Sequence, residues 1–408
     1  MPTYPTYKFT DLATLIRGVS YDKSVVSTSE REGYIPILRA NNIQNSLVLN
    51  DLVYVPNDFV KEEQMICEGD IVLAMSSGSK DLVGKSAQAD KDINAAFGTF
   101  CGLIRAKEIV DSKFLGLYFQ TQEYRNFVSY QSQGVNICNL KKKDIESLQI
   151  PLPPLTTQRA IVTRIETLFA ELDKAVQHLR SAQQQIKTYR QAALNHWLNN
   201  DDGKWEMVKL GEVLQKIEAG KSFRCNEKVP ALHEKGIVKI SAVTWGEFLE
   251  DECKTIINED LYNPQFAIHK GDLLISRANT IQLVGNCVLV RKEPKRNIML
   301  SDKVLRLVIS DNADSDFILY SLRTSKSRTQ IQNMSTGNQD SMRNIGQDRI
   351  KKIEIPLPPL TEQQRIVKEI ESRLSQAEAA EASIAEALQK TEALRQSILK
   401  KAFSGELV

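Results

Sequence analysis

The chain has 408 residues, of which 42% are hydrophobic and 25% are charged, and its formal net charge is +2. This length predicts two to four domains with substantial cores, and no apolar run approaches the roughly 20 residues of a membrane-spanning helix, so we expect no membrane partner. A near-neutral charge does not by itself indicate a nucleic-acid partner, because phosphate binding usually leaves a basic footprint.

The first half of the chain contains a predicted sequence of short strands and helices. After a start that reads KFTDLATLIRGVSYDKS (8–24), the segment EGDIVLAMSSGS (68–79) is strand-like, and a helical stretch follows Asp111–Ser112. Three prolines at 151, 153 and 154 then force an extended entry into a long helix, for which Thr156 is the predicted N-cap. Strands mixed with helices in this way predict an α/β domain.

The second half repeats the first. IPLPPLTTQRAIVTRIE (150–166) recurs as IPLPPLTEQQRIVKEIE (355–371), with 12 of 17 positions identical at an offset of 205. The offset is 198 near the start of each unit, 202 at the repeated Gly–Asp pair and 205 over the last part. Insertions therefore fall only in the first ~150 residues of each unit, as expected if loops tolerate them and a paired helix does not.

The long helices carry a heptad pattern typical of a coiled-coil seam. One series with seven-residue spacing begins at Ile165 in the first helix and at Ile370 in the second. Three residues after its members, a second series is formed by Leu168, Ala175, Ala182 and Tyr189 in the first helix. In the second helix this series is weaker (Arg373, Ala380, Ala387 and Leu394), and Leu374 and Leu388 share the seam. We predict an antiparallel pair related by a pseudo-twofold axis; two unrelated surface helices remain the alternative. The predicted seam and subunit-docking positions are Ile165, Leu172, Leu179, Ile186, Ile370, Ile384, Leu394 and Ile398.

The predicted fold class is therefore α+β, with two mixed α/β domains that alternate with two long helices paired as an antiparallel coiled coil. The predicted boundaries are 1–150 for the first domain, 151–200 for the first helix, 201–355 for the second domain and 356–408 for the second helix.

Several polar strings have the side chains that contact DNA phosphates or base edges. Arg reads guanine through two hydrogen bonds, Asn and Gln read adenine, and Lys binds phosphate as a point charge. These strings are alternatively solvated surface loops, and they supply the candidate DNA-binding residues Ser77, Ser79, Lys80, Lys85, Asn136, Lys141, Arg277, Asn279, Thr280, Gln282, Asn338 and Gln339.

Charge counts within the domains do not strengthen this prediction. Residues 1–150 carry 16 basic and 18 acidic side chains, and residues 201–355 carry 24 and 22. Either the basic side chains gather on one face of each domain, or other subunits supply much of the phosphate contact.

Two patterns imitate catalytic motifs. Asn263–Phe266 (NPQF) resembles an amino-methyltransferase motif but has Gln in its third position, and a turn is the preferred interpretation. Gly78–Ser86 resembles a phosphate-binding loop but has five residues between its glycines instead of four. The six cysteines and four histidines complete no zinc pattern, so we expect reduced thiols, no metal site and no catalytic residue.

Two variable domains, each followed by a similar helix that begins IPLPPLTxQ, and the ending LRQSILKKAFSGELV resemble the specificity subunits of type I restriction–modification enzymes over essentially the whole length. The resemblance implies a prokaryotic, cytoplasmic protein in which each domain reads one half of a split double-stranded DNA sequence. It implies no cofactor in this chain. Two methyltransferase (modification) subunits and two translocase–nuclease (restriction) subunits would be the partners that use S-adenosylmethionine, ATP and magnesium.

The repeats also differ from each other and from the family pattern. The second domain has RANT (277–280) where the first has MSSGS (75–79), so we expect the two half-sequences to differ. Arg365 fits the QxRIV pattern, whereas Ala160 stands at the matching place in the first unit. Two alternatives remain: a specificity subunit of another restriction–modification class, and a coiled-coil scaffold that binds no nucleic acid. The near-neutral charge favours the scaffold, and the paired IPLPPL motifs oppose it.

Overall fold

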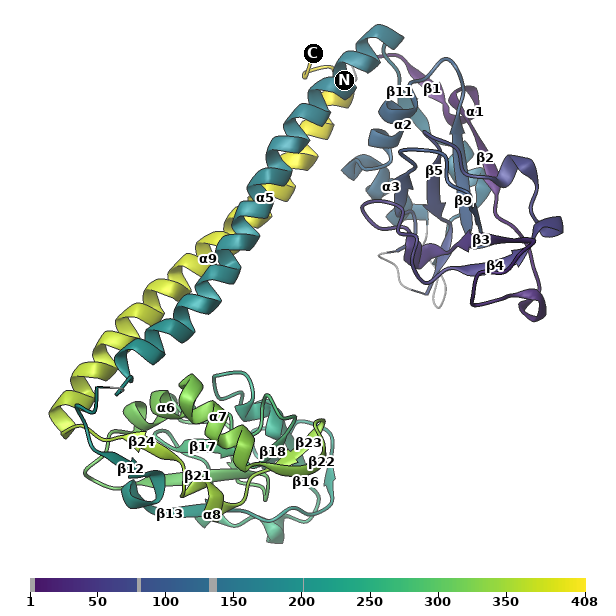
Figure 1. Cartoon of the computed structure of the whole chain (residues 1–408). Coiled ribbons are helices and arrows are strands. Elements are labelled where there is room, and N and C mark those ends of the chain that lie inside the picture. The colour runs from purple at the N-terminus through teal and green to yellow at the C-terminus, as the bar shows by residue number, and fades with distance from the viewer. Residues whose placement is uncertain (1–3, 79–81, 132–137, 201) are drawn as a thin grey trace. The chain divides into compact units, whose positions relative to one another are not determined.

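The computed structural model describes residues 4–78, 82–131, 138–200 and 202–408 (Figure 1). Its contacts divide the chain into two compact units: residues 1–180 together with 385–408, and residues 181–384. Each long helix therefore contributes one part to each unit. The long helices are α5 (Leu155–Trp197) and α9 (Leu360–Ser404).

The first unit contains a four-stranded antiparallel sheet in the order β2-β9-β5-β7 and a three-stranded sheet in the order β4-β3-β8. Two further strand pairs are β1·β11 and β6·β10. The strands are β1 (Thr6–Lys8), β2 (Ala13–Arg17), β3 (Tyr34–Leu38), β4 (Val53–Pro56), β5 (Ile71–Ala74), β6 (Ser76–Ser77), β7 (Ser86–Gln88), β8 (Ala96–Phe97), β9 (Cys101–Ala106), β10 (Cys138–Asn139) and β11 (Gln149–Pro151). The helices are α1 (Phe9–Leu12), α2 (Ser112–Tyr118), α3 (Gln122–Gln131) and α4 (Lys142–Glu146).

The second unit repeats this arrangement. Its four-stranded sheet has the order β13-β21-β17-β19, and a second sheet has the order β14-β16-β15-β20. A small three-stranded sheet, β18-β23-β22, corresponds to β6·β10. The strands are β12 (Met207–Lys209), β13 (Leu214–Ala219), β14 (Cys225–Asn226), β15 (Lys235–Val238), β16 (Cys253–Ile256), β17 (Leu273–Ser276), β18 (Ala278–Asn279), β19 (Cys287–Leu289), β20 (Asn297–Met299), β21 (Val304–Ile309), β22 (Thr336–Gln339), β23 (Met342–Asn344) and β24 (Glu354–Pro356). The helices are α6 (Ser315–Arg323), α7 (Ser325–Met334) and α8 (Gln347–Ile350).

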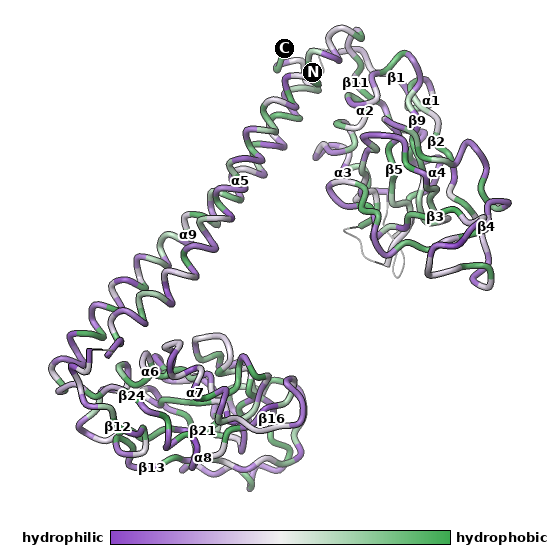
Figure 2. The backbone as a smooth tube through the Cα atoms, in the orientation of Figure 1, coloured by the Kyte–Doolittle hydropathy of each residue, from purple (hydrophilic) through white to green (hydrophobic). Residues whose placement is uncertain are grey.

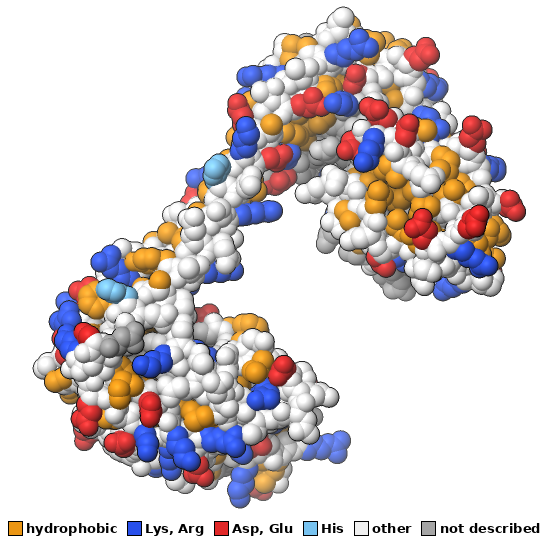
Figure 3. All heavy atoms as spheres, viewed as in Figure 1, with side chains coloured by type: hydrophobic (Ala, Val, Ile, Leu, Met, Phe, Trp, Pro, Cys, Tyr) orange, Lys and Arg blue, Asp and Glu red, His pale blue; other side chains and the backbone are white. Residues whose placement is uncertain are grey.

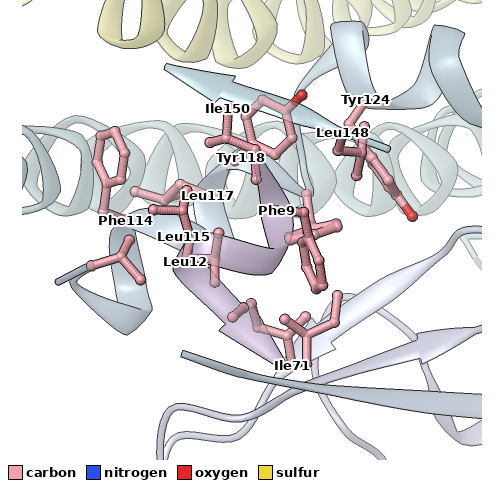
Figure 4. Packing of buried hydrophobic residues seen from close by; sticks show 14 of the residues in the cluster. Phe9, Leu12, Ile71, Phe114, Leu115, Leu117, Tyr118, Tyr124, Leu148 and Ile150 are labelled. Atoms are coloured by element: carbon pink, nitrogen blue, oxygen red, sulfur yellow. The ribbon is translucent and has the colours of Figure 1, made fainter. Parts of the chain in front are cut away.

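The core of the first unit joins the recognition domain to both long helices. Phe114 and Tyr118 of α2 pack on Phe403 near the end of α9, with ring centroids 4.8 and 5.5 Å apart. Figure 4 shows Phe114 and Tyr118 beside Phe9, Leu12 and Ile150 in this core. The core of the second unit likewise contains Leu194 of α5 and Ile370 of α9, so the sequence repeat is also a repeat of packing.

Within each unit, α5 and α9 run antiparallel. In the first unit Arg395 pairs with Asp173, and in the second unit Arg190 pairs with Glu378 and Glu381 at 3.9 and 3.1 Å. Both helices alternate hydrophilic and hydrophobic segments along their length (Figure 2). The predicted seam residues Ile165, Leu172, Leu179, Ile186, Ile370, Ile384 and Ile398 are buried or partly buried. The predicted pairing is confirmed.

The prediction that Leu394 packs in the seam is wrong. Leu394 is 50% exposed, and the next residue, Arg395, lies inward with its guanidinium carbon 4.2 Å from the centroid of the Phe169 ring. Leu374 is likewise partly buried where Arg373 is exposed, whereas Ala387 and Leu388 are both partly buried. Because an α-helix has 3.6 residues per turn, the inward face drifts away from a strict heptad pattern.

The glutamine of each IPLPPLTxQ motif explains why the motif is repeated. Gln158 is fully buried; its Oε1 accepts a hydrogen bond from the Asp111 N–H at 2.8 Å, and its Nε2 donates to the Pro153 carbonyl at 2.8 Å. Gln363 makes the same two bonds, to Asp314 and Pro358, both at 2.8 Å. The glutamine thus fastens the start of the long helix to the N-cap of α2 or α6. The helix α5 itself begins at Leu155, so Thr156 is not its cap as predicted.

Each predicted helical stretch after Asp111 and Asp314 is divided into two helices. Asp111 and Asp314 cap α2 and α6 as N-cap residues. A threonine then begins the next helix: the hydroxyl of Thr121 accepts from the Tyr124 N–H at 3.2 Å, and that of Thr324 from the Ser327 N–H at 3.3 Å. Threonine favours such caps over helix interiors, so the break was visible in the sequence and was missed.

Two repeated glycines allow the backbone to pass very closely. A Cβ atom on Gly18 would lie 2.0 Å from the carbonyl oxygen of Gly98, and a Cβ on Gly220 would lie 1.9 Å from that of Leu300. Such distances are impossible for real side chains, so both places require glycine. In the first unit this contact holds the segment before β9 against the end of β2. In the second unit it holds the segment before β21 against the end of β13.

Candidate nucleic-acid interface

In the first unit, the strands next to two of the polar strings form one strand pair. β6 pairs antiparallel with β10, with Ser77 opposite Cys138 and Ser76 opposite Asn139. Ser79, Lys80 and Asn136, three of the predicted DNA-binding residues, lie outside the described residues.

Two predicted lysines lie near this strand pair in the sequence, Lys85 after β6 and Lys141 after β10. Lys85 is half-buried. Its backbone carbonyl accepts a hydrogen bond from the Ala74 N–H at 2.9 Å, which fixes Lys85 next to the end of β5. Lys141 is exposed and precedes α4, where its N–H donates to the Asp144 carboxylate at 2.8 Å. The N–H of the neighbouring Leu140 donates to the Met75 carbonyl at 2.8 Å, which holds this segment near β6. Lys141 lies two residues after the end of β10.

In the second unit, the corresponding strings form a small sheet. Asn279 of β18 lies opposite Arg343 of β23, and Gln339 of β22 lies opposite Met342, which also belongs to β23. The Ile281 N–H also donates to the Asp340 carbonyl at 2.8 Å. Segments some sixty residues apart in the chain thus share one surface.

The predicted residues of this sheet differ in their surroundings. Arg277 has an exposed side chain, and its backbone is fixed by bonds from its N–H to the Lys303 carbonyl and from the Ile345 N–H to its own carbonyl, at 2.8 and 2.9 Å. Asn338, Gln339 and Gln282 are also exposed.

Asn279 and Thr280 are less exposed and are held by hydrogen bonds. The Asn279 amide donates to the Thr244 hydroxyl at 3.3 Å, and its Oδ1 accepts from the Thr280 N–H at 2.8 Å. Both side chains are half-buried. Asn279 therefore also holds the turn that contains Thr244, in addition to any role at a base edge.

The strings are supported by residues that the sequence patterns did not single out. Arg343 fastens β22 to β23 by donating to the carbonyls of Ser335 and Gly337 at 2.8 and 3.0 Å. Phe100 and Lys303, which lie next to β6 and β18 respectively, are exposed. The available signal was their matching position before the repeated strands β9 and β21.

Charged side chains of both signs cover one part of the second unit. Figure 3 shows Lys and Arg side chains with Asp and Glu side chains among them over the region of β13 and α8. Lys209, Arg349, Lys351 and Lys352 are exposed there, and so are Glu212 and Asp348.

The motif-like strings are structural. Asn263 is the N-cap of a short 3₁₀ helix, Pro264–Phe266, whose Gln265 N–H donates to its side chain at 3.0 Å. Strand β7, not a helix, follows Gly84, so the phosphate-loop geometry is absent. In the described ranges, no helix is long and apolar enough to span a membrane, and no group of three His, Cys, Asp or Glu side chains could hold a metal ion.

A cavity of about 330 Å³ in the second unit is lined by Cys287, Arg323 and Arg328. Both guanidinium groups donate to backbone carbonyls, Arg323 to Cys287 at 2.8 Å and Arg328 to Val284 at 2.8 Å. Burial raises the pKa of the Cys287 thiol, which keeps it protonated and weakly nucleophilic. These arginines brace loops, and the cavity has no reactive group.

Comparison with known proteins identifies the family. The family model described as "Type I restriction modification DNA specificity domain" matches residues 1–179 and 202–389. The chain is 33% identical to the type I restriction enzyme EcoKI specificity subunit of Escherichia coli K12, over 97% of this chain and 87% of that protein. It is 31% identical to the StySPI specificity subunit of Salmonella potsdam, over 99% of this chain and 89% of that one.

Solved structures agree on the fold. A chain from a study of complex assembly and conformational transition in a type I restriction–modification system matches with a TM-score of 0.75 and 21% identity, covering 100% of this chain and 99% of that chain. The HsdS subunit from Thermoanaerobacter tengcongensis matches with a TM-score of 0.55 and 20% identity, covering 99% and 97%. The predicted fold class and family resemblance are thus confirmed. The chain belongs to the specificity subunits of type I restriction–modification enzymes, the non-catalytic components that determine which DNA sequence the enzyme recognises.

Proposed function

We propose that each domain reads one half of a bipartite DNA sequence through the edge formed by β6 and β10 in the first unit and by β18, β23 and β22 in the second. One observation carries this proposal: the repeat pairs corresponding strands in both units, β6 with β10 and β18 with β23, but with different side chains. A common scaffold with different exposed groups is what two different half-sequences require.

The lysines and the arginine of the candidate interface have different roles in this proposal. Lys85 and Lys141 bind phosphate oxygens and set the register, because an ammonium group is a point charge without directional preference. Arg277 reads a base, since its planar guanidinium has no acidic partner among the described ion pairs and its backbone is held on both sides. Asn338 and Gln339 add amide groups from the neighbouring strand β22.

The outer faces of the long helices dock the partner subunits. Tyr189 and Leu394 are 42% and 50% exposed and occupy equivalent positions at the 205-residue offset. Two equivalent apolar positions suit two copies of one partner, the methyltransferase subunits, to which two translocase–nuclease subunits then add for cleavage. S-adenosylmethionine, ATP and magnesium bind to those partners.

The assignment is tested on the complex of this chain with its modification subunits. Arg277→Ala should weaken binding to the recognised sequence by about 1–3 kcal/mol and relax one position of the second half-sequence. Lys85→Ala should instead weaken binding to all sequences and reduce the salt slope by about one. Methylome sequencing identifies the sequence, and binding at several salt concentrations gives the slope. Arg277→Ala acting equally on every sequence would show that it is a phosphate contact.

A further inference from the structure

Phe100 is a large apolar side chain held out into solvent. It is 67% exposed and lies in a turn closed by the Cys101 N–H, which donates to the Gly98 carbonyl at 2.8 Å. The hydroxyl of Thr99 donates to the Val19 carbonyl at 2.8 Å. Because Gly98 also passes against Gly18, the turn is fixed on both sides and Phe100 cannot easily fold back onto the core.

The turn is part of the edge that carries the polar strings. The Phe100 carbonyl accepts from the N–H groups of Met75 and Ser76 at 2.8 and 3.2 Å. The Met75 carbonyl accepts in turn from the Leu140 N–H at 2.8 Å, next to β10. A continuous set of backbone hydrogen bonds thus places Phe100 beside the strand pair β6·β10.

The second unit has the corresponding backbone contact with different side chains. There the Arg277 N–H donates to the Lys303 carbonyl at 2.8 Å, and Lys303 precedes β21 as Phe100 precedes β9. The pair Met75 and Phe100 in the first unit is therefore replaced by Arg277 and Lys303 in the second. One backbone position is apolar in one domain and cationic in the other.

We propose that Phe100 is an apolar DNA contact that selects a thymine in the half-sequence read by the first domain, by packing on its 5-methyl group. That methyl is the apolar group that a base pair presents in the major groove, whereas the cations of the second unit suit guanine or phosphate. The inference rests on the proposed DNA-reading edge. Phe100 thus contributes to sequence specificity, a role that neither its exposure nor the polar strings indicate alone.

The test uses the complex of the full chain with its modification subunits and a labelled duplex that carries the recognised sequence. Each thymine of the first half-sequence is replaced singly by deoxyuridine, which removes only the methyl group. At one position this should weaken binding about fourfold, the value expected for one buried carbon. With Phe100→Ala, overall affinity should fall on the order of tenfold, and the same deoxyuridine should have no further effect.

Two variants serve as matched controls. Phe100→Leu keeps an apolar side chain and should retain part of the preference for thymine. Lys303→Ala changes the equivalent position of the second unit and should reduce the salt slope by about one, whereas Phe100→Ala removes no charge and should leave the slope unchanged.

Several results would overturn the inference. They are a first half-sequence without thymine, a deoxyuridine effect that is the same with Phe100 and with Phe100→Ala, and a loss of modification-subunit binding by Phe100→Ala in the absence of DNA. The last would make Phe100 a protein contact. If Arg277→Ala and Lys303→Ala also leave DNA binding unchanged, the proposed edge itself fails. If those two weaken binding and Phe100→Ala does not, only the role of Phe100 fails.

Discussion

Replacing Gln158 by methionine should loosen the attachment of the first recognition domain to its helix. Methionine has a similar length but cannot replace the two hydrogen bonds, so it leaves the Asp111 N–H and the Pro153 carbonyl without the Gln158 side chain as a partner. Each buried polar group left unsatisfied costs about 1–3 kcal/mol, so the loss of both bonds should make the variant less stable by about 2–6 kcal/mol. The loss should be confined to the first unit, because both partners lie there.

Hydrogen exchange measured by mass spectrometry can locate this loss. We expect faster exchange in α2, which begins beside Asp111, and unchanged exchange in α6. Gln363→Met should give the opposite pattern, with a slightly larger effect, since Gln363 also donates to the Asn312 carbonyl at 3.2 Å. Calorimetric unfolding provides the overall change in stability.

Gln185→Met, at an exposed position of the same helix, is the matched control and should change little. Equal stability and equal α2 exchange in Gln158→Met and Gln185→Met would refute the argument that the motif glutamine joins helix and domain. A uniform increase in exchange over both units would show that the bonds stabilise the long helices and not one domain.

Three further predictions follow from the repeat. Gly18→Ala and Gly220→Ala should each destabilise their own unit by several kcal/mol, because the new Cβ meets a backbone carbonyl, whereas Gly78→Ala, whose new Cβ meets no atom of the described residues within 4 Å, should be nearly neutral in thermal unfolding. Four residues inserted after Gln184 and four after Ile384, at matching points of the antiparallel pair, should lengthen α5 and α9 by about 6 Å each and the gap between half-sequences by one or two base pairs; an unchanged gap in the methylome of an active complex would mean that the helices do not set the gap. Tyr189→Glu together with Leu394→Glu should leave circular dichroism unchanged and reduce binding of the modification subunits at least tenfold, and full binding would place the docking surface elsewhere.

The candidate interface could be predicted only in part. The strings around Ser77 and Arg277 were found because their residue types match those that contact DNA, and their distance from the second strings in the sequence gave no sign that β10 and β23 bring them together. Phe100 and Lys303 were missed, since only their matching position before β9 and β21 distinguishes them in the sequence from other exposed loop residues. Their significance depends on two backbone hydrogen bonds formed across about 25 residues of chain.

The sequence by itself determined the duplication, the two long helices and their pairing, and the family. These follow from local periodicity and from a motif that appears twice, and both can be recognised without knowledge of tertiary contacts. Only the tertiary structure decided which residues face inward along the helices. A heptad count placed Leu394 in the seam, but the actual helical period and the contact of Arg395 with Phe169 and Asp173 turned it outward. It also decided why the motif ends in glutamine, because the partners of Gln158 are backbone groups 47 and 5 residues away, and a backbone hydrogen bond leaves no trace in the identity of the residue that provides it.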